Sequence, residues 1–583
     1  MNLSTEHRPP VSRRSWLIAA LLLAFSVIWF SSLDYRKLIQ PDEGRYAEIA
    51  REMVASGDWL TPRLNDLKYF EKPPLQYWMT AAAFKVFGEH AWTARLWPGL
   101  TGFLSILLLF FTAQRLFNRR VACYSALCLG SSLFTVLISH INTLDMGLSF
   151  FLQSALCCLL LANDARTNEA QRRRWMLWVW VALALAMLSK GLVSLVLCGA
   201  TLVLYSLLTR DLTPWKRLEL RRGLPLFLLL AAPWFVAVSW RNPEFFQFFF
   251  IHEHFERFLT KEHGRYQPAW YFFAVLLVGT LPWTSLNLHA WFIAWRRERA
   301  PLPAARETPP AAKGVRFQPQ RLLVVWALLI LGFFSASSSK LPSYILPMAP
   351  ALALLTGIFL TEVRRRTLLV HLSLVLPISL AALYFAPQIA NSADALTPLA
   401  MLRDYANWAA LAAILWFLGS LLGLVLVWRK RLTQGLCSFA CAGFIALMLI
   451  TLGHETLARS NSAHDLAQTI KPLLPQGVAF YSVSMYEQTL PFYLQRTLTL
   501  VNYRDELGFG LDQEPSKGIA TLAEFDKLWR SASTHGEDAF AVMGRSTYEE
   551  LSAQSLPMQF VAADFRRVVV RLPQPSKTRA TQA

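Results

Sequence analysis

Charged residues and cysteines are scarce in this sequence, and several common motifs are missing. Asp, Glu, Lys and Arg make up only 16% of the 583 residues. All seven cysteines fall in long apolar stretches, which argues against a disulfide framework and against a cysteine-ligated zinc site. No glycine-rich phosphate-binding fingerprint is present, so we expect no nucleotide to be bound.

Apolar stretches dominate the rest of the chain, where hydrophobic residues reach 54% and the mean hydropathy is +0.34. A membrane-spanning helix needs roughly 17 to 25 mostly apolar residues, and on that basis we predict about thirteen spans. The first span lacks a clear cleavage site and is interpreted as a retained anchor. The predicted spans lie near residues 15–32, 95–114, 121–139, 144–161, 175–190, 192–209, 223–239, 270–292, 321–338, 343–361, 367–385, 406–428 and 433–453.

The net charge of +19 is concentrated in alternate short loops between these spans. Cytoplasmic loops of membrane proteins collect Lys and Arg, so topology explains the basic balance and we exclude a nucleic-acid partner. The same rule puts the N-terminus in the cytoplasm. The loop after the first span and the C-terminal region then face outward, which fits a multi-pass protein of an inner membrane with a periplasm.

Two regions are expected. Residues 1–453 form a mainly α, polytopic transmembrane bundle, with extracytoplasmic segments at 33–94 and 240–269 that carry interfacial helices. One of these helices is predicted to be capped by Asp42, to end at Gly57 and to lie along the membrane surface. Residues 454–583 alternate helical and strand patterns and predict a periplasmic α/β domain. Its expected strands are 478–483, 498–501, 539–543 and 568–572, and its expected helices are 465–474, 486–494 and 522–531.

The first outward segment holds two groups of charged residues. Asp42 and Glu43 are adjacent, so they diverge on a helix, and we expect one carboxylate to act and the other to support it. The alternative is an ordinary helix cap with first-turn acids. Glu71 and Lys72 precede two prolines that stiffen the backbone, which suits anion binding. Alternatively, Lys72 lies at the membrane boundary.

Further candidates occupy the outward ends of other spans. Asp145, Lys190 and Lys340 lie there, although each one alone is more simply explained, Asp145 as a helix cap and the two lysines as boundary cations. In the second outward segment, His252 and Glu256 share a helical face and Arg257 follows, where a solvated helix is the simpler interpretation. All of these residues fall on one side of the membrane, and we therefore predict one shared site.

The motifs around these residues resemble those of the 4-amino-4-deoxy-L-arabinose transferases of lipid A. That family belongs, with the protein O-mannosyltransferases, to the polyprenyl-phosphate-dependent GT-C glycosyltransferases. The resemblance covers essentially the whole chain. It is carried by Gln40-Pro41-Asp42-Glu43, Arg45-Tyr46-Ala47-Glu48, Tyr69-Phe70-Glu71-Lys72-Pro73, Leu144-Asp145 and Lys340-Leu341-Pro342-Ser343-Tyr344-Ile345-Leu346.

The resemblance implies transfer of aminoarabinose from undecaprenyl phosphate to a lipid A phosphate at the periplasmic face, which confers resistance to cationic peptides such as polymyxin. It implies Asp42 as the principal catalytic carboxylate and Asp145 as a second important one, and we add Glu43 to the catalytic group as the neighbour of Asp42. A divalent metal, expected to be zinc, is implied at Glu71 and His252. We expect a monomer in contact with membrane lipids. The residues implied for the donor phosphate are Lys72, Arg257, Tyr344, Tyr46 and Tyr69, and we add Lys340, which lies in the same motif as Tyr344.

Two alternatives remain. The same architecture is compatible with another sugar or with a protein hydroxyl acceptor, for which Asp42 would act as a general base. A transporter would use ionisable residues near the middle of its spans, whereas the candidates here cluster at one face.

Overall fold

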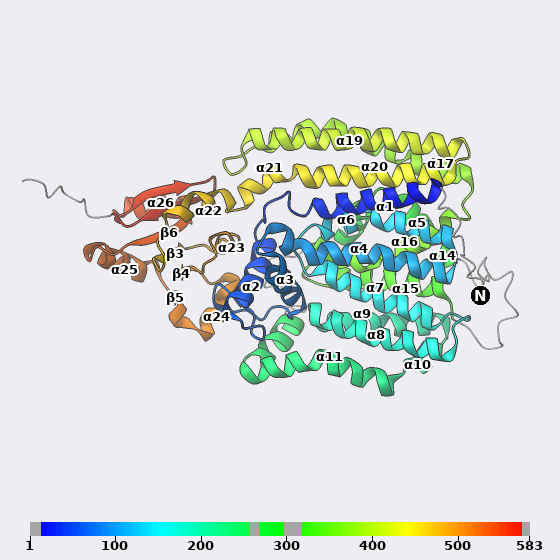
Figure 1. Cartoon of the computed structure of the whole chain (residues 1–583), viewed down its shortest axis with the longest axis horizontal. Coiled ribbons are helices and arrows are strands. Elements are labelled where there is room, and N and C mark those ends of the chain that lie inside the picture. The colour runs from blue at the N-terminus through cyan, green and yellow to red at the C-terminus, as the bar shows by residue number, and fades with distance from the viewer. Residues whose placement is uncertain (1–12, 257–266, 297–316, 574–583) are drawn as a thin grey trace, which may run out of the picture.

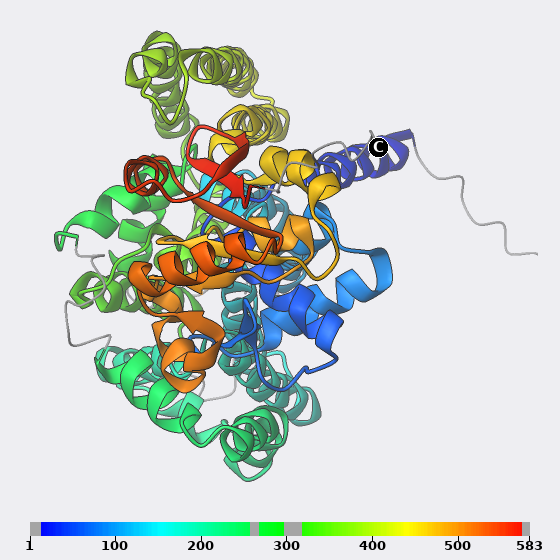
Figure 2. The ribbon, with the colours of Figure 1, turned by 90° about the vertical axis from the view of Figure 1, so that its left-hand side faces the viewer.

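A computed structural model describes residues 13–256, 267–296 and 317–573. Figure 1 shows a large helical bundle at one end of the molecule and a smaller domain with a sheet at the other. Helices α2 (Asp42–Ser56) and α3 (Leu75–Phe87) lie between the two. Viewed from the sheet end in Figure 2, the small domain covers the middle of the bundle.

The bundle consists of long apolar helices around one continuous hydrophobic core. Short turns α10 (Thr213–Lys216), η3 (Pro342–Met348) and η4 (Ala386–Ser392) connect some of them. The helices of the bundle are α1 (Arg13–Ser31), α4 (Ala91–Leu116), α5 (Arg119–Gly130), α6 (Leu133–Ser139), α7 (Asp145–Ala162), α8 (Glu169–Lys190), α9 (Val193–Thr209), α11 (Leu220–Arg241), α13 (Tyr271–Gly279), α14 (Thr284–Arg296), α15 (Pro319–Ala336), α16 (Ala349–Leu360), α17 (Arg365–Ser373), α18 (Val375–Phe385), α19 (Leu399–Trp428) and α20 (Leu432–Gly453).

Each predicted span coincides with a helix or with a pair of consecutive helices. Among the described residues, 8 helices are long and apolar enough to cross a membrane, or up to 10 if two bent pairs each count as one span. The pairs α5–α6 and α13–α14 bend by 58° and 113°. Pro282 lies in the second break, where its missing N–H interrupts the helical hydrogen bonds. Our count of about thirteen spans also includes helix α8 and two shorter apolar helices, Ala20–Ser31 of α1 and α9.

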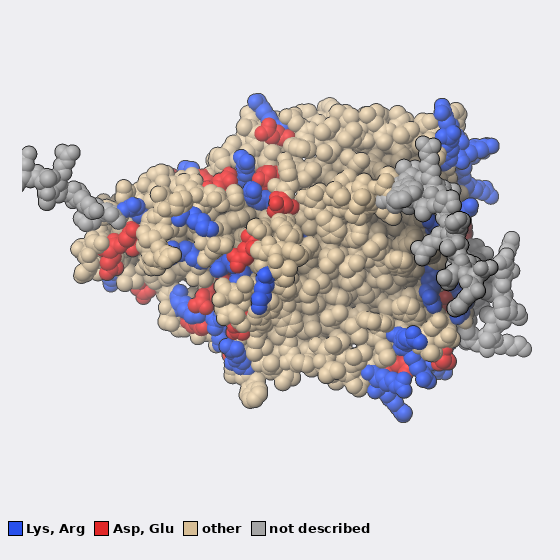
Figure 3. Space-filling model, in the orientation of Figure 1, with Lys and Arg blue, Asp and Glu red and all other residues tan. Residues whose placement is uncertain are grey.

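Charge is distributed over the surface as a membrane protein requires. On the face drawn in Figure 3, a broad belt across the bundle shows almost no Lys, Arg, Asp or Glu, and charged side chains gather at its two ends. Such a belt matches the apolar interior of a bilayer, in which an exposed charge is unfavourable. The pattern agrees with a multi-pass arrangement.

The predicted helix after the first span is present as α2, and Gly57 ends it with a left-handed φ of 73°. Its environment differs from our prediction. The apolar stripe is buried, but the polar face is buried as well, since Glu48 accepts a hydrogen bond from Arg51 at 2.7 Å and Glu52 accepts one from the Asn65 amide at 2.5 Å. Helix α2 is therefore enclosed between the bundle and the C-terminal domain, rather than lying along a membrane surface.

The remaining outward elements are short. Strands β1 (Arg63–Leu64) and β2 (Leu67–Lys68) form a small hairpin between α2 and α3. Within the second outward segment, residues Gln247–Glu256 form a π-helix, η1.

The C-terminal domain is built on a mixed sheet of 6 strands in the order β5-β4-β3-β6-β8-β7. The first four in that order pair in parallel, and β8 pairs antiparallel with both of its neighbours, β6 and β7. The strands are β3 (Ala479–Val483), β4 (Thr499–Val501), β5 (Gly518–Ile519), β6 (Ala539–Gly544), β7 (Gln559–Ala563) and β8 (Arg567–Arg571).

Helices cover both faces of this sheet. Alternate residues of β6 point to opposite faces, so Phe540 packs with α22 and α23, whereas Met543 packs with α25 and α26. The expected α/β domain is confirmed, although strands β5 and β7 were missed. The helical segments are α21 (Glu455–Ala458), η5 (Arg459–Asn461), α22 (His464–Ile470), η6 (Lys471–Leu473), α23 (Leu490–Leu494), η7 (Asp505–Leu507), α24 (Gly508–Gln513), η8 (Pro515–Lys517), α25 (Leu522–Thr534) and α26 (Arg545–Ala553).

Candidate active site

A cavity of about 390 Å³ opens where α2, the loop before α3, the start of α7, the end of α8 and η3 meet. Its lining combines four carboxylates and three cations with an apolar wall. The charged lining residues are Asp42, Glu71, Asp145, Glu253, Arg45, Lys72 and Lys190. The remaining lining residues include Leu148, Leu192, Val193, Val196, Phe333, Phe334, Tyr46 and Tyr344.

Asp42 is the first residue of α2 and faces this cavity. We expected its side chain to cap the helix, but Pro41 occupies the capping position and no side-chain cap is formed. The Asp42 side chain is 41% exposed, and its Oδ1 lies 3.6 Å from Nη1 of Arg45. A carboxylate left accessible in a charged cavity can meet a ligand, which a capping carboxylate cannot.

Lys72 enters the cavity from a loop that Pro73 and Pro74 stiffen. Its ammonium lies 3.0 Å from Oε2 of Glu253 and 3.8 Å from Oε2 of Glu71. The Glu253 side chain is only 3% exposed, so this pair is shielded from water. Glu253 was missed in our sequence analysis, which weighed its neighbour His252 instead.

Asp145 and Lys190 form an ion pair between the start of α7 and the end of α8. The Lys190 ammonium also lies 4.6 Å from the ring centroid of Tyr344, a distance at which the aromatic face attracts a cation. The structure thus brings Asp145 and Tyr344 into the same cavity as Asp42 and Lys72. Lys190, a candidate that alone is more simply explained as a boundary cation, also lines this cavity.

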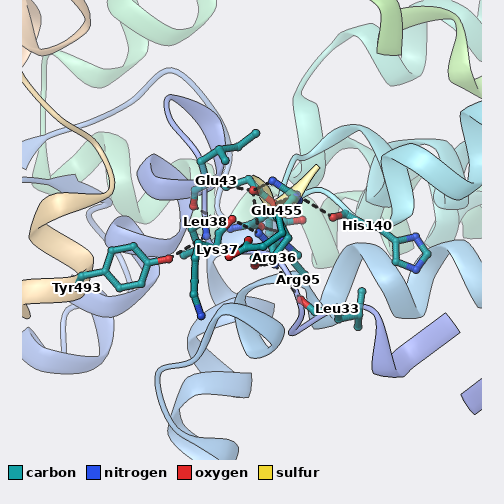
Figure 4. A network of polar contacts seen from close by, with 12 residues as sticks. Leu33, Arg36, Lys37, Leu38, Glu43, Arg95, His140, Glu455 and Tyr493 are labelled. Atoms are coloured by element: carbon teal, nitrogen blue, oxygen red, sulfur yellow. Dashed lines mark hydrogen bonds and ion pairs between the residues drawn. The ribbon is translucent and has the colours of Figure 1, made fainter. Parts of the chain in front are cut away.

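Glu43 lies outside the cavity lining, in a buried network that Figure 4 shows in detail. Arg36 donates to its two carboxylate oxygens at 2.7 and 2.9 Å, and Arg95 of α4 donates to them at 2.6 and 2.9 Å. The Asn142 amide adds a bond of 3.1 Å. Burial raises the pKa of Glu43, but the guanidinium groups of Arg36 and Arg95 outweigh it and lower that pKa to about 2.

This network favours a structural role for Glu43 over the catalytic role that we predicted. A carboxylate whose two oxygens are held by two guanidinium groups has no lone pair directed at a substrate. Instead, Glu43 joins three segments that are far apart in sequence: the loop before α2, helix α4 and the loop that leads to Asp145. We therefore assign Glu43 a structural role next to Asp42.

Three further predicted residues lie outside the cavity lining within the described part of the chain. Lys340 is buried and donates to the Ser337 carbonyl at 2.5 Å, so its ammonium is directed into its own loop. Tyr69 is buried, and its phenol oxygen accepts a hydrogen bond from Nη1 of Arg45 at 3.5 Å. The ring of His252 stacks on Phe248 at 5.2 Å between centroids. Arg257 lies outside the described residues.

The residues expected to bind a metal do not form a complete ligand set where the structure describes them. No group of three or more His, Cys, Asp or Glu side chains suited to a metal ion occurs among residues 13–256, 267–296 and 317–573. Glu71 and His252 alone would be fewer than the three protein ligands typical of zinc sites. No chemical step is therefore assigned to a metal here.

The phenols of Tyr46 and Tyr69 remain protonated near neutral pH. Burial raises the pKa of Tyr46 well above its ordinary value, and the nearby Asp42 carboxylate raises it further. Burial also raises the pKa of Tyr69. A protonated Tyr46 is a hydrogen-bond donor in the cavity, which suits an anionic ligand.

Comparison with known proteins identifies the family. The family model "Dolichyl-phosphate-mannose-protein mannosyltransferase" matches residues 14–249, and "Aminoarabinose transferase C-terminal domain" matches residues 466–572. An "Undecaprenyl phosphate-alpha-4-amino-4-deoxy-L-arabinose arabinosyl transferase" of Pectobacterium carotovorum subsp. carotovorum (strain PC1) is 31% identical over 512 residues, which cover 84% of this chain and 86% of the relative. The chain belongs to this arabinosyl transferase family.

Other members support the assignment. A relative with the same name in Pseudomonas paraeruginosa (strain DSM 24068 / PA7) is 34% identical over 348 residues, which cover 59% of each chain. The crystal structure of ArnT from Cupriavidus metallidurans bound to undecaprenyl phosphate is 38% identical, with a TM-score of 0.88 over 96% of this chain and 98% of that one. The expected GT-C fold, with its C-terminal sheet domain, is confirmed for this member of the arabinosyl transferase family.

Proposed function

We propose that this protein transfers 4-amino-4-deoxy-L-arabinose from undecaprenyl phosphate to a phosphate of lipid A. The single observation that carries the proposal is the cavity that holds Asp42, Lys72 and Asp145 together in a fold similar to that of ArnT bound to undecaprenyl phosphate. The family names supply the sugar and the lipid carrier. The periplasmic face of an inner membrane as the place of reaction, and a monomeric state, belong to the same proposal.

The charges of the cavity suit such a donor. An undecaprenyl phosphate sugar carries an anionic phosphate next to a sugar whose amino group is cationic. Lys72 and Lys190 offer ammonium groups to the phosphate, and Asp42 and Asp145 offer carboxylates to the sugar. The apolar wall at Val196 and Phe333 offers a surface to the polyprenyl chain.

Transfer breaks the bond between the sugar's anomeric carbon and the donor phosphate and forms one from that carbon to the acceptor phosphate. Negative charge grows on the leaving phosphate, and a nearby ammonium such as Lys72 stabilises it, an effect often worth about 3 kcal/mol in a site shielded from water. The acceptor phosphate is already anionic, so it requires no general base. Asp42 is then available to balance the positive charge that develops on the sugar ring.

The test is direct. Purified protein is mixed with undecaprenyl phosphate aminoarabinose and lipid A, and the lipid A is analysed by mass spectrometry, alongside lipid A from cells with and without this gene. We expect the mass of one added aminopentose, present only with the gene. Transfer of another sugar, or transfer to protein with lipid A unchanged, would contradict the proposal.

A divalent metal at Glu71 and His252 stays a prediction. Elemental analysis of the purified wild-type protein and of the variant Glu71→Ala tests it. Glu244→Ala is the control, because Glu244 pairs with Lys68 at 2.6 Å outside the cavity lining. Zinc present in the wild type and in Glu244→Ala, but lost in Glu71→Ala, would support the site. Equal zinc in all three proteins would exclude Glu71 as a ligand.

A further inference from the structure

A carboxylate of the C-terminal domain reaches a cation of the cavity. Glu506 lies in η7, and its Oε2 is 2.5 Å from Nη2 of Arg45. The two side chains are only 12% and 6% exposed. Gln488 donates to the other oxygen of Glu506 at 2.7 Å, so the carboxylate is held in one orientation. Buried, charge-assisted contacts of this kind are directional and stronger than exposed ion pairs.

The guanidinium of Arg45 faces two ways. Its Nη2 is bound by Glu506, whereas its Nη1 lies 3.6 Å from Oδ1 of Asp42 and 3.5 Å from the phenol oxygen of Tyr69. Arg45 therefore connects a residue of the C-terminal domain to the carboxylate that lies open to the cavity.

The backbone reinforces this connection. Gly44 lies between Asp42 and Arg45 in sequence, and a Cβ at this position would be 2.6 Å from the carbonyl carbon and oxygen of Gln488. The C-terminal domain thus packs directly on the first turn of α2. A displacement of Gln488 or Glu506 would therefore alter contacts of Gly44 or Arg45, which lie within one helical turn of Asp42.

We propose that Glu506 is a positioning residue for the transfer reaction, acting through Arg45 to orient Asp42. The reaction concerned is that of the proposed function, and the added claim is that the C-terminal domain completes the active site. Glu506 itself lies outside the cavity lining and need not touch the substrate.

A matched control exists on the same interface. Glu514 pairs with Arg63 at 3.0 Å, and this pair also joins the C-terminal domain to the first outward segment. Within the domain, Glu514 pairs with Lys517 at 3.2 Å. None of these three residues lines the cavity as described. Glu514→Gln therefore weakens the docking of the domain without touching Arg45.

The experiment compares wild type, Glu506→Gln, Glu514→Gln, Arg45→Gln and the double variant Arg45→Gln/Glu506→Gln, all as full-length protein in detergent. We expect Glu506→Gln to lower kcat about tenfold with a donor KM within about threefold, and Glu514→Gln to keep the wild-type kcat. Because Glu506 acts through Arg45, the double variant should be no slower than Arg45→Gln alone. Losses that multiply, or an equal loss in Glu514→Gln, would overturn the proposal.

Hydrogen exchange separates this proposal from the proposed function. Amides of residues 40–46 should exchange faster in Glu506→Gln than in wild type or Glu514→Gln, whatever sugar is transferred. Faster exchange in a protein that moves no aminoarabinose would support the coupling and refute the proposed function. Unchanged exchange in Glu506→Gln would refute the coupling even if transfer to lipid A is observed.

Discussion

Lys72 and Glu253 form an ion pair across the cavity, with 3.0 Å between the ammonium and the carboxylate. The pair joins the rigid loop before α3 to η1, a segment more than a hundred residues later in the chain. An anionic phosphate that enters the cavity competes with Glu253 for the same ammonium. In the proposed function, the donor phosphate therefore gains a cation that the protein already holds in the cavity lining.

We predict that Lys72→Ala strongly lowers the rate of transfer and weakens donor binding, because the leaving phosphate loses its cation. A loss of about 3 kcal/mol corresponds to roughly a hundredfold in rate. Lys68→Ala is the control, since Lys68 pairs with Glu244 at 2.6 Å outside the cavity lining and should retain activity. Turnover and the binding of undecaprenyl phosphate are measured on both variants. Wild-type donor affinity in Lys72→Ala would contradict the phosphate role.

Asp42→Asn tests the carboxylate that faces the sugar in our proposal. We expect kcat to fall by about 10²–10³, as is typical when a charge that stabilises a transition state is removed, with a smaller change in donor KM. Asp58→Asn serves for comparison, because Asp58 lies in the same outward segment, pairs with Arg241 at 3.3 Å and lies outside the lining. Steady-state kinetics at varied donor concentration separate the two parameters. Unchanged turnover in well-expressed Asp42→Asn would rule out its catalytic role.

Glu43→Gln should destabilise the fold. Removing the charge leaves Arg36 and Arg95 buried without their anion, which typically costs about 3–5 kcal/mol. The folded-state pKa of Glu43 is about 2, below its ordinary 4.5, so its stabilisation is complete above pH 4.5 and is lost as the pH falls toward 2. Melting temperatures of wild type and variant in detergent should therefore converge over that range.

The surface pair Asp526–Arg530, 3.0 Å apart in α25, provides the reference for this comparison. Asp526→Asn should change stability by less than about 1 kcal/mol, because exposed ion pairs contribute little. A Glu43→Gln protein that melts together with Asp526→Asn at neutral pH would show that the buried network is not a major source of stability.

Gly44→Ala tests the packing of the C-terminal domain on α2. The new methyl group would meet the Gln488 backbone at 2.6 Å, and overpacking of this kind costs about 1–3 kcal/mol. Gly199→Ala is the matched change, since no heavy atom lies within 4 Å of a Cβ built there. We expect a lower melting temperature and lower turnover only for Gly44→Ala. Equal behaviour of the two variants would contradict the tight contact.

Patterns along the chain predicted where helices and strands form better than they predicted which residues are in contact. The apolar runs marked the helices of the bundle, and Gly57 marked the end of α2. Arg36 and Arg95 gave no signal, because an ion pair between residues 43 and 95 depends on how distant segments pack. Strand β7 was missed because it lies at the edge of the sheet, where most of its residues are exposed and apolar alternation is weak.

The same limit applies to the site. Asp42, Lys72 and Asp145 stood out because charge beside a membrane is unusual. The partners of that charge did not stand out: Glu253 and Glu506 are ordinary acidic residues in sequence, and only the fold brings them to Lys72 and Arg45. The catalytic role predicted for Glu43 rested on its position next to Asp42, whereas its contacts with Arg36 and Arg95 favour a structural role.

The enclosure of α2 limits how this protein can be divided. A truncation after Gly453 would fall at the end of α20, between the helical bundle and the C-terminal domain. It would also remove the domain that packs on α2, the helix that carries Asp42, and would expose an apolar surface that includes Ile49 and Met53. A chimera that exchanges the terminal region between relatives must therefore exchange the first outward loop with it.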